Sequence, residues 1–214
     1  MKKFFCIFLL CVITVSMISC QNNNSSNLPD VQVTEPQKDR VKEVEDLIKD
    51  ALSATAFGIA EEDYESCKKT VEKAEEAYNK LTQNEKDTLG EENKYILTWS
   101  RQILNIATAR KVATEKAQNK IKKNLINPNS MQVNDTDCYI YYDKNTKAPV
   151  VVSITIDFSA QNGFGGYHRD TDYFYYKLNN DGSIYQEIGV SEYNSITDQS
   201  GVELFSFLLW DFKD

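Results

Sequence analysis

The sequence predicts an α+β fold: an N-terminal helical region, a long connecting helix and a small antiparallel β-sheet domain. Two patterns support this prediction. Between Val150 and Phe158, apolar residues occupy every second position, which is typical of an antiparallel strand with one face on a core. Upstream of Pro128, apolar residues recur at three- and four-residue steps, the spacing of amphipathic helices. Helices therefore come first and the sheet follows.

Residues 38–112 form the predicted helical region. The apolar stripe of its first helix, which falters near Gly58, consists of Val41, Val44, Ile48, Ala51, Leu52 and Thr55. The stripe of its second helix has coiled-coil-like spacing and consists of Tyr64, Cys67, Val71, Ala74, Tyr78 and Leu81. Thr82 and Glu85 have the spacing of a capping box. A further short helical turn is therefore expected to start at Thr82 and end near Gly90.

A third helix is predicted from about Glu92 to Pro128. Its stripe consists of Ile96, Trp99, Ile103, Ile106, Ala107, Arg110, Ala113, Ala117, Ile121 and Leu125. A helix of this span is about 50 Å long at about 1.5 Å per residue. We therefore expect a bend near residues 109–111.

The sheet domain is predicted to span residues 113–214, including the end of the long helix. The expected strands are Tyr139–Tyr142, Val150–Ser159, Tyr173–Leu178 and Ser183–Ile188. Between the last two strands, Asn179–Gly182 has the composition of a hairpin connection. The apolar residues from Gly201 to Phe212 predict a closing helix, with Ser200 as its cap.

The N-terminal residues 1–19 have the layout of a bacterial export signal. Lys2 and Lys3 precede an apolar run from Phe4 to Ile18, which is shorter than the about 20 residues needed to span a bilayer. The run ends in Met17-Ile18-Ser19-Cys20, which resembles a bacterial lipobox, with Met17 at the position where Leu is usual. The resemblance implies cleavage before Cys20 and lipidation of that cysteine, with palmitate among the acyl chains. The alternative is an ordinary secretory signal with a chance cysteine.

Residues 20–37 predict a flexible tether after the lipidated cysteine, because they are rich in Asn and Ser and contain two prolines. The expected location is thus the extracytoplasmic face of the cell membrane, with the lipid anchor as the attachment. Loss of Lys2 and Lys3 with the signal changes the formal charge from −8 to −10. So acidic a chain is repelled by nucleic acid and by anionic lipid surfaces. Neither is an expected partner.

Five cysteines occur in the sequence. Cys6 and Cys11 leave with the signal and Cys20 carries the lipid, so Cys67 and Cys138 remain. They are either two buried free thiols or one disulfide between the helical region and the sheet, which export permits.

Two segments resemble known protein classes. The stretch Ala74–Lys86 is similar to the helical repeats of Gram-positive surface proteins, through its A-x-x-A-Y-x-x-L-T-x-x-x-K pattern. The patterns K-x-x-L-x-x-P-x-S at Lys122–Ser130 and A-Q-N-x-F-G at Ala160–Gly165 resemble a small α+β domain of uncharacterised exported and lipid-anchored bacterial proteins. The first resemblance implies a helical spacer or adhesive stalk. The second implies a fold and a location without an activity.

Tyrosines along the predicted strands suggest a partner surface, because tyrosine-rich sheet faces suit peptide, protein or glycan contacts. The alternative is that the aromatic residues only stabilise the sheet as cross-strand pairs. The residues predicted to contact a ligand or partner are Asn162, Phe164, Tyr167, His168, Tyr173 and Tyr175.

His168 is the only histidine, and it alternates with Asp170 and Asp172. Three such residues could hold a metal on one face of an extended segment, but their spacing matches no familiar zinc motif. Phosphate binding by the glycines at 163–166 is not expected either, because a strand and not a helix follows them. Instead the glycines are interpreted as a bulged connection, with Phe164 packing back on the sheet. No metal and no cofactor is predicted.

The sequence therefore predicts a membrane-anchored extracytoplasmic lipoprotein that acts as a non-enzymatic binding module. Its partner would be an envelope or extracellular protein. The alternative is an extracytoplasmic enzyme, or an enzyme inhibitor, with its site in the loop 160–172.

Overall fold

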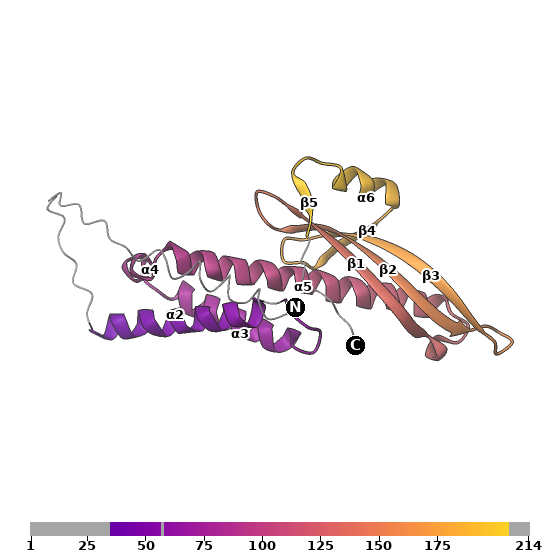
Figure 1. Ribbon diagram of the computed structural model, residues 1–214, viewed down its shortest axis with the longest axis horizontal. Helices are drawn as coiled ribbons and strands as arrows, with labels where there is room; N and C mark the ends of the chain where they lie inside the picture. The colour runs from indigo at the N-terminus through magenta and orange to yellow at the C-terminus, as the bar shows by residue number, and fades with distance from the viewer. Residues whose placement is uncertain (1–34, 57, 206–214) are drawn as a thin grey trace, which may run out of the picture. The chain divides into compact units, whose positions relative to one another are not determined.

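The computed structural model describes residues 35–56 and 58–205, with helices first and a sheet after them (Figure 1). Its α-helices are α2 (Glu35–Thr55), α3 (Tyr64–Asn79), α4 (Gln83–Leu89), α5 (Glu91–Asn124) and α6 (Val190–Thr197). A short 3₁₀ turn, η1 (Pro128–Ser130), follows α5. Its strands are β1 (Gln132–Asp143), β2 (Pro149–Gln161), β3 (Tyr167–Leu178), β4 (Ile184–Ile188) and β5 (Val202–Leu204). The predicted α+β class is confirmed. The predicted signal, Cys20 and most of the predicted tether lie outside the described residues.

The helical core is formed by the apolar stripes of α2, α3 and the first half of α5. Its fully or nearly fully buried residues include Val44, Ile48, Val71, Ala74, Ile103 and Leu104. These stripes have the spacing that the sequence predicts, although Leu52 is only half buried. Burial of one apolar stripe per helix is what holds helices of this length together, since isolated helices are marginal in water.

The predicted capping box at Thr82 is present at the start of α4, and its glutamate also contacts α2. Thr82 accepts a hydrogen bond from the Glu85 backbone N–H, and the Glu85 carboxylate accepts one from the Thr82 backbone N–H at 2.8 Å. The same carboxylate pairs with Arg40 of α2. This local start signal for α4 therefore also fastens α4 to α2.

The helix α5 is uninterrupted through residues 109–111, where the sequence led us to expect a bend (Figure 1). Its 34 residues span about 51 Å at about 1.5 Å per residue. Ile103 and Leu104 belong to the helical core, whereas Ile106 and Ala113 belong to the core under the sheet. The predicted boundary between residues 112 and 113 thus falls inside a helix that both cores use.

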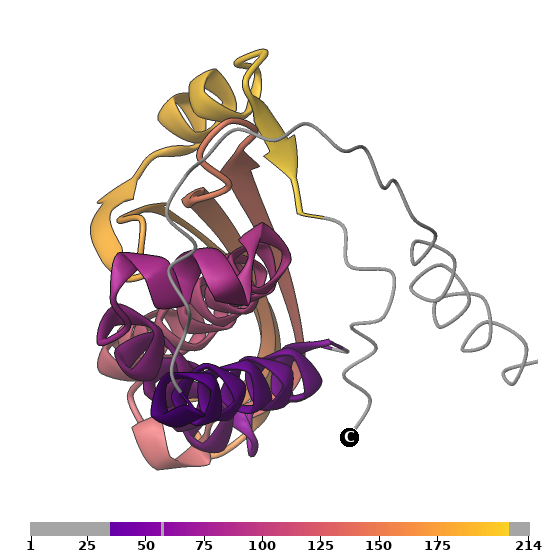
Figure 2. The same ribbon diagram turned by 90° about the vertical axis from the view of Figure 1, so that its left-hand side faces the viewer.

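The sheet is antiparallel, with strand order β4-β3-β2-β1-β5. The second half of α5 packs against one face of it, as Figure 2 shows from the end of the helices. The apolar face predicted for β2 is confirmed, because Val152, Ile154 and Ile156 are fully buried in this core, but Val151 and Ser153 of the other face are buried as well.

Two strands are longer than the sequence predicts. β1 begins at Gln132 and β3 at Tyr167, where polar residues hide the alternation. With these extensions, β1 and β3 each pair with nearly the whole of β2. Cross-strand hydrogen bonds therefore order these segments without apolar side chains of their own. As a result, only residues 162–166 connect β2 to β3.

The C-terminal prediction is wrong where the structure describes it. Val202–Leu204 forms the edge strand β5, which pairs with Tyr141–Asp143 of β1, and Ser200 lies in a turn and not at a helix start. The remainder of the predicted closing helix, residues 206–212, lies outside the described residues. The helix α6 was not predicted from the sequence.

Candidate functional site

The sheet has an inner face, which packs on α5, and an outer face on its other side. On β2, the outer face is formed by Val151, Ser153, Thr155, Asp157 and Ser159. The register places Tyr139 of β1 and Tyr175 of β3 on either side of Ser153, and Asp137 and Tyr173 on either side of Thr155. The tyrosines therefore lie in two neighbouring rows across the strands.

The helix α6 covers one end of the outer face. There the ring of Tyr193 lies 5.9 Å from the ring of Tyr141 and 4.7 Å from that of Tyr175. Burial raises the pKa of Tyr193, and a hydrogen bond to Tyr141 adds to the increase. Val151 is fully buried beneath this cluster. This end of the face is a small second core and is closed to a partner.

The middle of the outer face is open to solvent at Tyr139, Thr155 and Tyr173, whereas Ser153 is buried and hydrogen-bonded to Tyr193 of α6. Tyr139 is 48% exposed and Tyr173 is 62% exposed. They stand on β1 and β3, strands that lie about 10 Å apart with β2 between them, and they are diagonal to each other because Tyr139 is level with Ser153 and Tyr173 with Thr155. Two exposed phenols beside small polar side chains form a shallow surface that offers both apolar contact and hydrogen bonds.

A polar network closes the other end of the outer face. Arg169 donates to both carboxylate oxygens of Asp157, at 2.8 and 3.0 Å from its Nε, and Asn134 donates to the same carboxylate at 2.9 Å. Asn134 reaches this point because it is the extra residue of a β-bulge in β1. The hydrogen bond from Arg169, with that from Asn134, lowers the pKa of Asp157. The charges and hydrogen-bonding groups of Arg169, Asp157 and Asn134 are thus paired with one another, and they form the rim of the open surface.

Three of the six residues predicted as a partner surface share this face. Tyr167, Tyr173 and Tyr175 occupy alternate positions of β3, although Tyr175 is half covered by α6. Tyr139, which the six omit, completes the surface. Its position across Ser153 from Tyr175, and diagonal to Tyr173, depends on the register of β1 and β3 on β2 and could not be read from the sequence.

The other three predicted residues lie elsewhere. Asn162 shapes the β2–β3 turn, because its Oδ1 accepts hydrogen bonds from the N–H groups of Phe164 and Gly166 at 3.0 Å each. Phe164 does not pack back on the sheet, as the sequence suggested, but is 101% exposed. His168 pairs with Ala160 and so belongs to the opposite face from the tyrosines. In residues 35–56 and 58–205, no group of three or more His, Cys, Asp or Glu is arranged to hold a metal.

Cys67 and Cys138 are both free thiols. The Cys67 Sγ donates to the carbonyl oxygen of Ala54 at 3.2 Å, and burial raises the pKa of this thiol. Desolvation raises the pKa of Cys138 to about 12. Because the thiolate is the reactive form, neither cysteine is a nucleophile at neutral pH.

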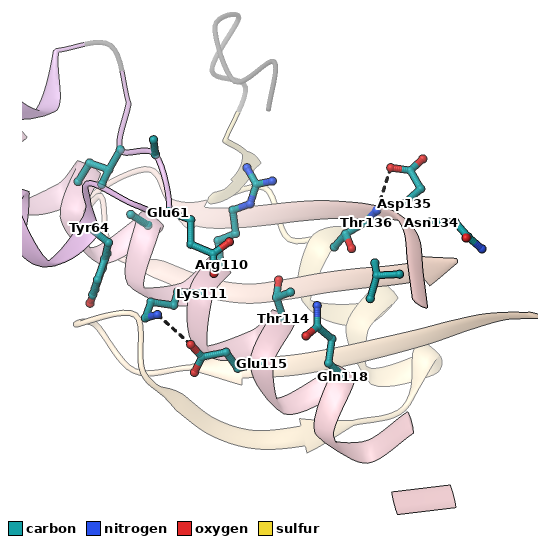
Figure 3. A pocket seen from close by; sticks show the side chains of 14 residues that line it. Glu61, Tyr64, Arg110, Lys111, Thr114, Glu115, Gln118, Asn134, Asp135 and Thr136 are labelled. Atoms are coloured by element: carbon teal, nitrogen blue, oxygen red, sulfur yellow. Dashed lines mark hydrogen bonds and ion pairs between the residues drawn. The ribbon is translucent and has the colours of Figure 1, made fainter. Parts of the chain in front are cut away.

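A cavity of about 400 Å³ lies between the α2–α3 connection, α5 and the start of β1 (Figure 3). Lys111 and Glu115 of α5 form an ion pair across 2.9 Å in its wall. The ammonium of Lys111 also lies 5.6 Å from the ring centre of Tyr64.

The cavity wall offers little acid–base chemistry. The hydrogen bond that Lys111 donates to Glu115 raises the pKa of Lys111, so this amine stays protonated and cannot serve as a base. No histidine, cysteine or serine is among the residues that line the cavity. Two cations, Arg110 and Lys111, face the carboxylates of Glu61, Glu115 and Asp135. This near balance favours neither an anion nor a cation as a ligand.

Comparison with known proteins found no match: no family model fits the chain, and no curated protein and no solved structure is significantly similar to it. Of the helices in the described part of the chain, none combines the length and the apolar character needed to span a membrane.

Proposed function

We propose that this protein is a lipid-anchored extracytoplasmic lipoprotein that binds an envelope or extracellular protein without catalysing a reaction. The signal-like layout of residues 1–19 and the lipobox-like Met17–Cys20 support the anchor. Replacement of Cys20 by Ala should then abolish labelling of the chain with radioactive palmitate, and unchanged labelling would exclude a lipid at this residue.

The observation that carries the binding proposal is the open part of the outer face. Tyr139 and Tyr173 remain exposed on a sheet whose other face is sealed by α5 and whose end is sealed by α6. Large exposed aromatic side chains on a rigid sheet lose little entropy on binding, and tyrosine is enriched among the residues that dominate protein interfaces. The perturbed groups in the same domain, such as Asp157 and Cys138, have pKa values shifted away from neutrality. They are therefore poor candidates for general acid–base catalysis.

The test is capture of partners from intact cells by the mature protein, followed by a binding measurement with the purified partner. Tyr139→Ala and Tyr173→Ala should each weaken retention about tenfold or more, as loss of a central aromatic contact does. Tyr95→Ala is the matched control, because Tyr95, at 68%, is more exposed than either sheet tyrosine but lies on α5 outside the sheet domain's faces. If the control lowers retention as much as the sheet variants do, the outer face is not the binding surface.

A further inference from the structure

The sheet domain ends in an exposed apolar tip, made of Ile126, Phe164 and Tyr167. Phe164 is 101% exposed and Ile126 is 80% exposed. Ile126 lies beside the β2–β3 turn that carries Phe164, because its Cδ1 is 3.6 Å from the point that a Cβ on Gly163 would occupy. The tip thus combines the loop after α5 with the β2–β3 turn, two segments far apart in the sequence.

Hydrogen bonds fix the backbone of the apolar tip, although the Phe164 and Ile126 side chains are largely exposed. The N–H of Asn162 donates to the carbonyl oxygen of Gly166 at 2.8 Å, which closes the turn beneath Phe164. Asn127 donates to the side chain of Gln161 at 3.0 Å, and the Gln161 N–H donates to Ser130 at 2.8 Å. These bonds tie the loop that carries Ile126 to the end of β2. The hydrogen-bonded backbone of the turn therefore directs Phe164 away from the sheet and into solvent.

Charge is segregated at this end of the chain. Residues 116–134 contain four lysines and no carboxylate, in a chain whose formal net charge is −8. Of these lysines, Lys120 pairs with Glu187 of β4. Lys122 and Lys123 are exposed in the last turn of α5, directly before the loop that carries Ile126. The acidic net charge therefore does not describe the surroundings of the tip, where cations flank exposed apolar side chains.

We propose that the apolar tip docks on the surface of an anionic phospholipid membrane. Phe164 and Ile126 enter the boundary between headgroups and acyl chains, while Lys122 and Lys123 contact the lipid phosphates. A protein partner fits this end less well. A specific protein interface covers about 800 Å² on each side, whereas the tip is a turn and a short loop with three exposed apolar side chains.

This contact is separate from the proposed lipid anchor and does not depend on it. The helix α2 begins beside α4, as the Arg40–Glu85 pair shows, whereas the tip lies past the other end of α5. That helix spans about 51 Å. In an anchored protein the tip is thus a second attachment, and the first attachment raises its effective concentration at the membrane.

The test uses the mature chain with Cys20→Ser, so that no lipid is attached, and vesicles of phosphatidylglycerol and phosphatidylcholine in roughly equal amounts. Co-sedimentation should show binding that is absent with phosphatidylcholine alone and weakens as salt is raised. Phe164→Ser should lower the partition coefficient about tenfold. Lys122→Gln together with Lys123→Gln should lower it about 20-fold or more, from about fivefold for each charge.

Matched controls separate the tip from general surface effects. Lys69→Gln with Lys73→Gln removes two exposed lysines of α3, and Tyr139→Ala removes an exposed aromatic residue of the outer face. Neither should change vesicle binding, and Phe164→Ser should not change retention of the protein partner. Failure of the protein-binding proposal is thereby distinguished from failure of this one.

A second measurement covers binding too weak to sediment. In acylated protein carrying Phe164→Trp, brominated lipids should quench more tryptophan fluorescence than in the acylated parent protein. Vesicle binding that is the same for wild type and Phe164→Ser would overturn the proposal. The proposal would also be overturned if the unacylated chain did not bind vesicles and the acylated Phe164→Trp variant showed no extra quenching.

Discussion

At the scale of single residues, Glu85 shows how a local signal becomes a tertiary contact. The Thr82–Glu85 pair is recognisable in the sequence as a helix start, yet the Glu85 side chain is almost completely buried. A buried carboxylate is stable only when it is paired and hydrogen-bonded, and Arg40 from α2 supplies the charge. The hydrogen bond from Arg40, followed by those from Thr82, lowers the pKa of Glu85 to about 2 from 4.5.

This pKa predicts how stability depends on pH. Because the folded-state pKa is depressed, the contribution of Glu85 is fully present above pH 4.5 and is lost as pH falls toward 2. Glu85→Gln should therefore lower the urea midpoint at neutral pH, and the gap between variant and wild type should narrow between pH 4.5 and 2. Glu62→Gln, which removes an exposed carboxylate, should follow the wild type throughout. A gap independent of pH would mean that the shape of the side chain matters and its charge does not.

At the scale of elements, two turns of the sheet use glycine for different reasons. Gly165 in the β2–β3 turn and Gly182 in the β3–β4 turn both have φ +84°. A Cβ on Gly165 would meet nothing within 4 Å, whereas one on Gly182 would lie 2.0 Å from the carbonyl oxygen of Asn105 in α5. Asn105 also donates to the carbonyl of Asn180 at 2.9 Å. The β3–β4 turn thus lies directly on the backbone of α5 at Gly182, whereas the β2–β3 turn has open space beside Gly165.

Alanine at the two glycines should separate backbone strain from steric overlap. Gly165→Ala should cost about 1–2 kcal/mol, the penalty of a left-handed conformation for a residue with a Cβ. Gly182→Ala has the same φ penalty plus about 1–3 kcal/mol for overpacking against α5. Urea unfolding of both variants measures the difference. Equal losses would show that the β3–β4 turn can move off α5 at no cost.

At the scale of the whole molecule, α5 joins two cores that share no other helix among the described residues. Its residues Ile103 and Leu104 hold α2 and α3, and Ile106 to Ile121 hold the sheet. The half-buried Phe205, which follows β5, packs against both. A continuous helix transmits the unfolding of one core to the other, so the described residues should unfold as one cooperative unit.

Native-state hydrogen exchange tests this coupling. In the wild type, the slowest amides of α3 and β2 should exchange with the same opening free energy. Val112→Pro should destabilise the protein by about 3 kcal/mol or more, because proline removes a backbone hydrogen bond and clashes with the preceding turn. It should also give α3 and β2 different opening free energies. Val112→Ala keeps the helix and should preserve a single value; separate values already in the wild type would contradict the coupling.

Much of the fold could be predicted from the sequence because the relevant signals are local. The apolar spacing from Val41 to Thr55 and from Tyr64 to Leu81, the capping box at Thr82 and the alternation in Val150–Phe158 each record burial of one face of one element. Of the candidate site, Tyr173 and Tyr175 could be assigned to a common face, since alternate residues of a strand always share one. Tyr167 was part of the predicted loop 160–172 and joins that face because β3 is longer than predicted.

Other features depend on residues distant in the sequence, and these only the tertiary structure decided. The polar start of β1 becomes a strand because β2 offers it hydrogen-bond partners, and Val202–Leu204 becomes a strand because β1 has an open edge. Periodicity shows that a strand has two different faces but not what covers each one. Because α6 covers only one end of the sheet, Tyr141 lies against Tyr193. Tyr139, two residues away on the same strand, instead becomes part of an open surface.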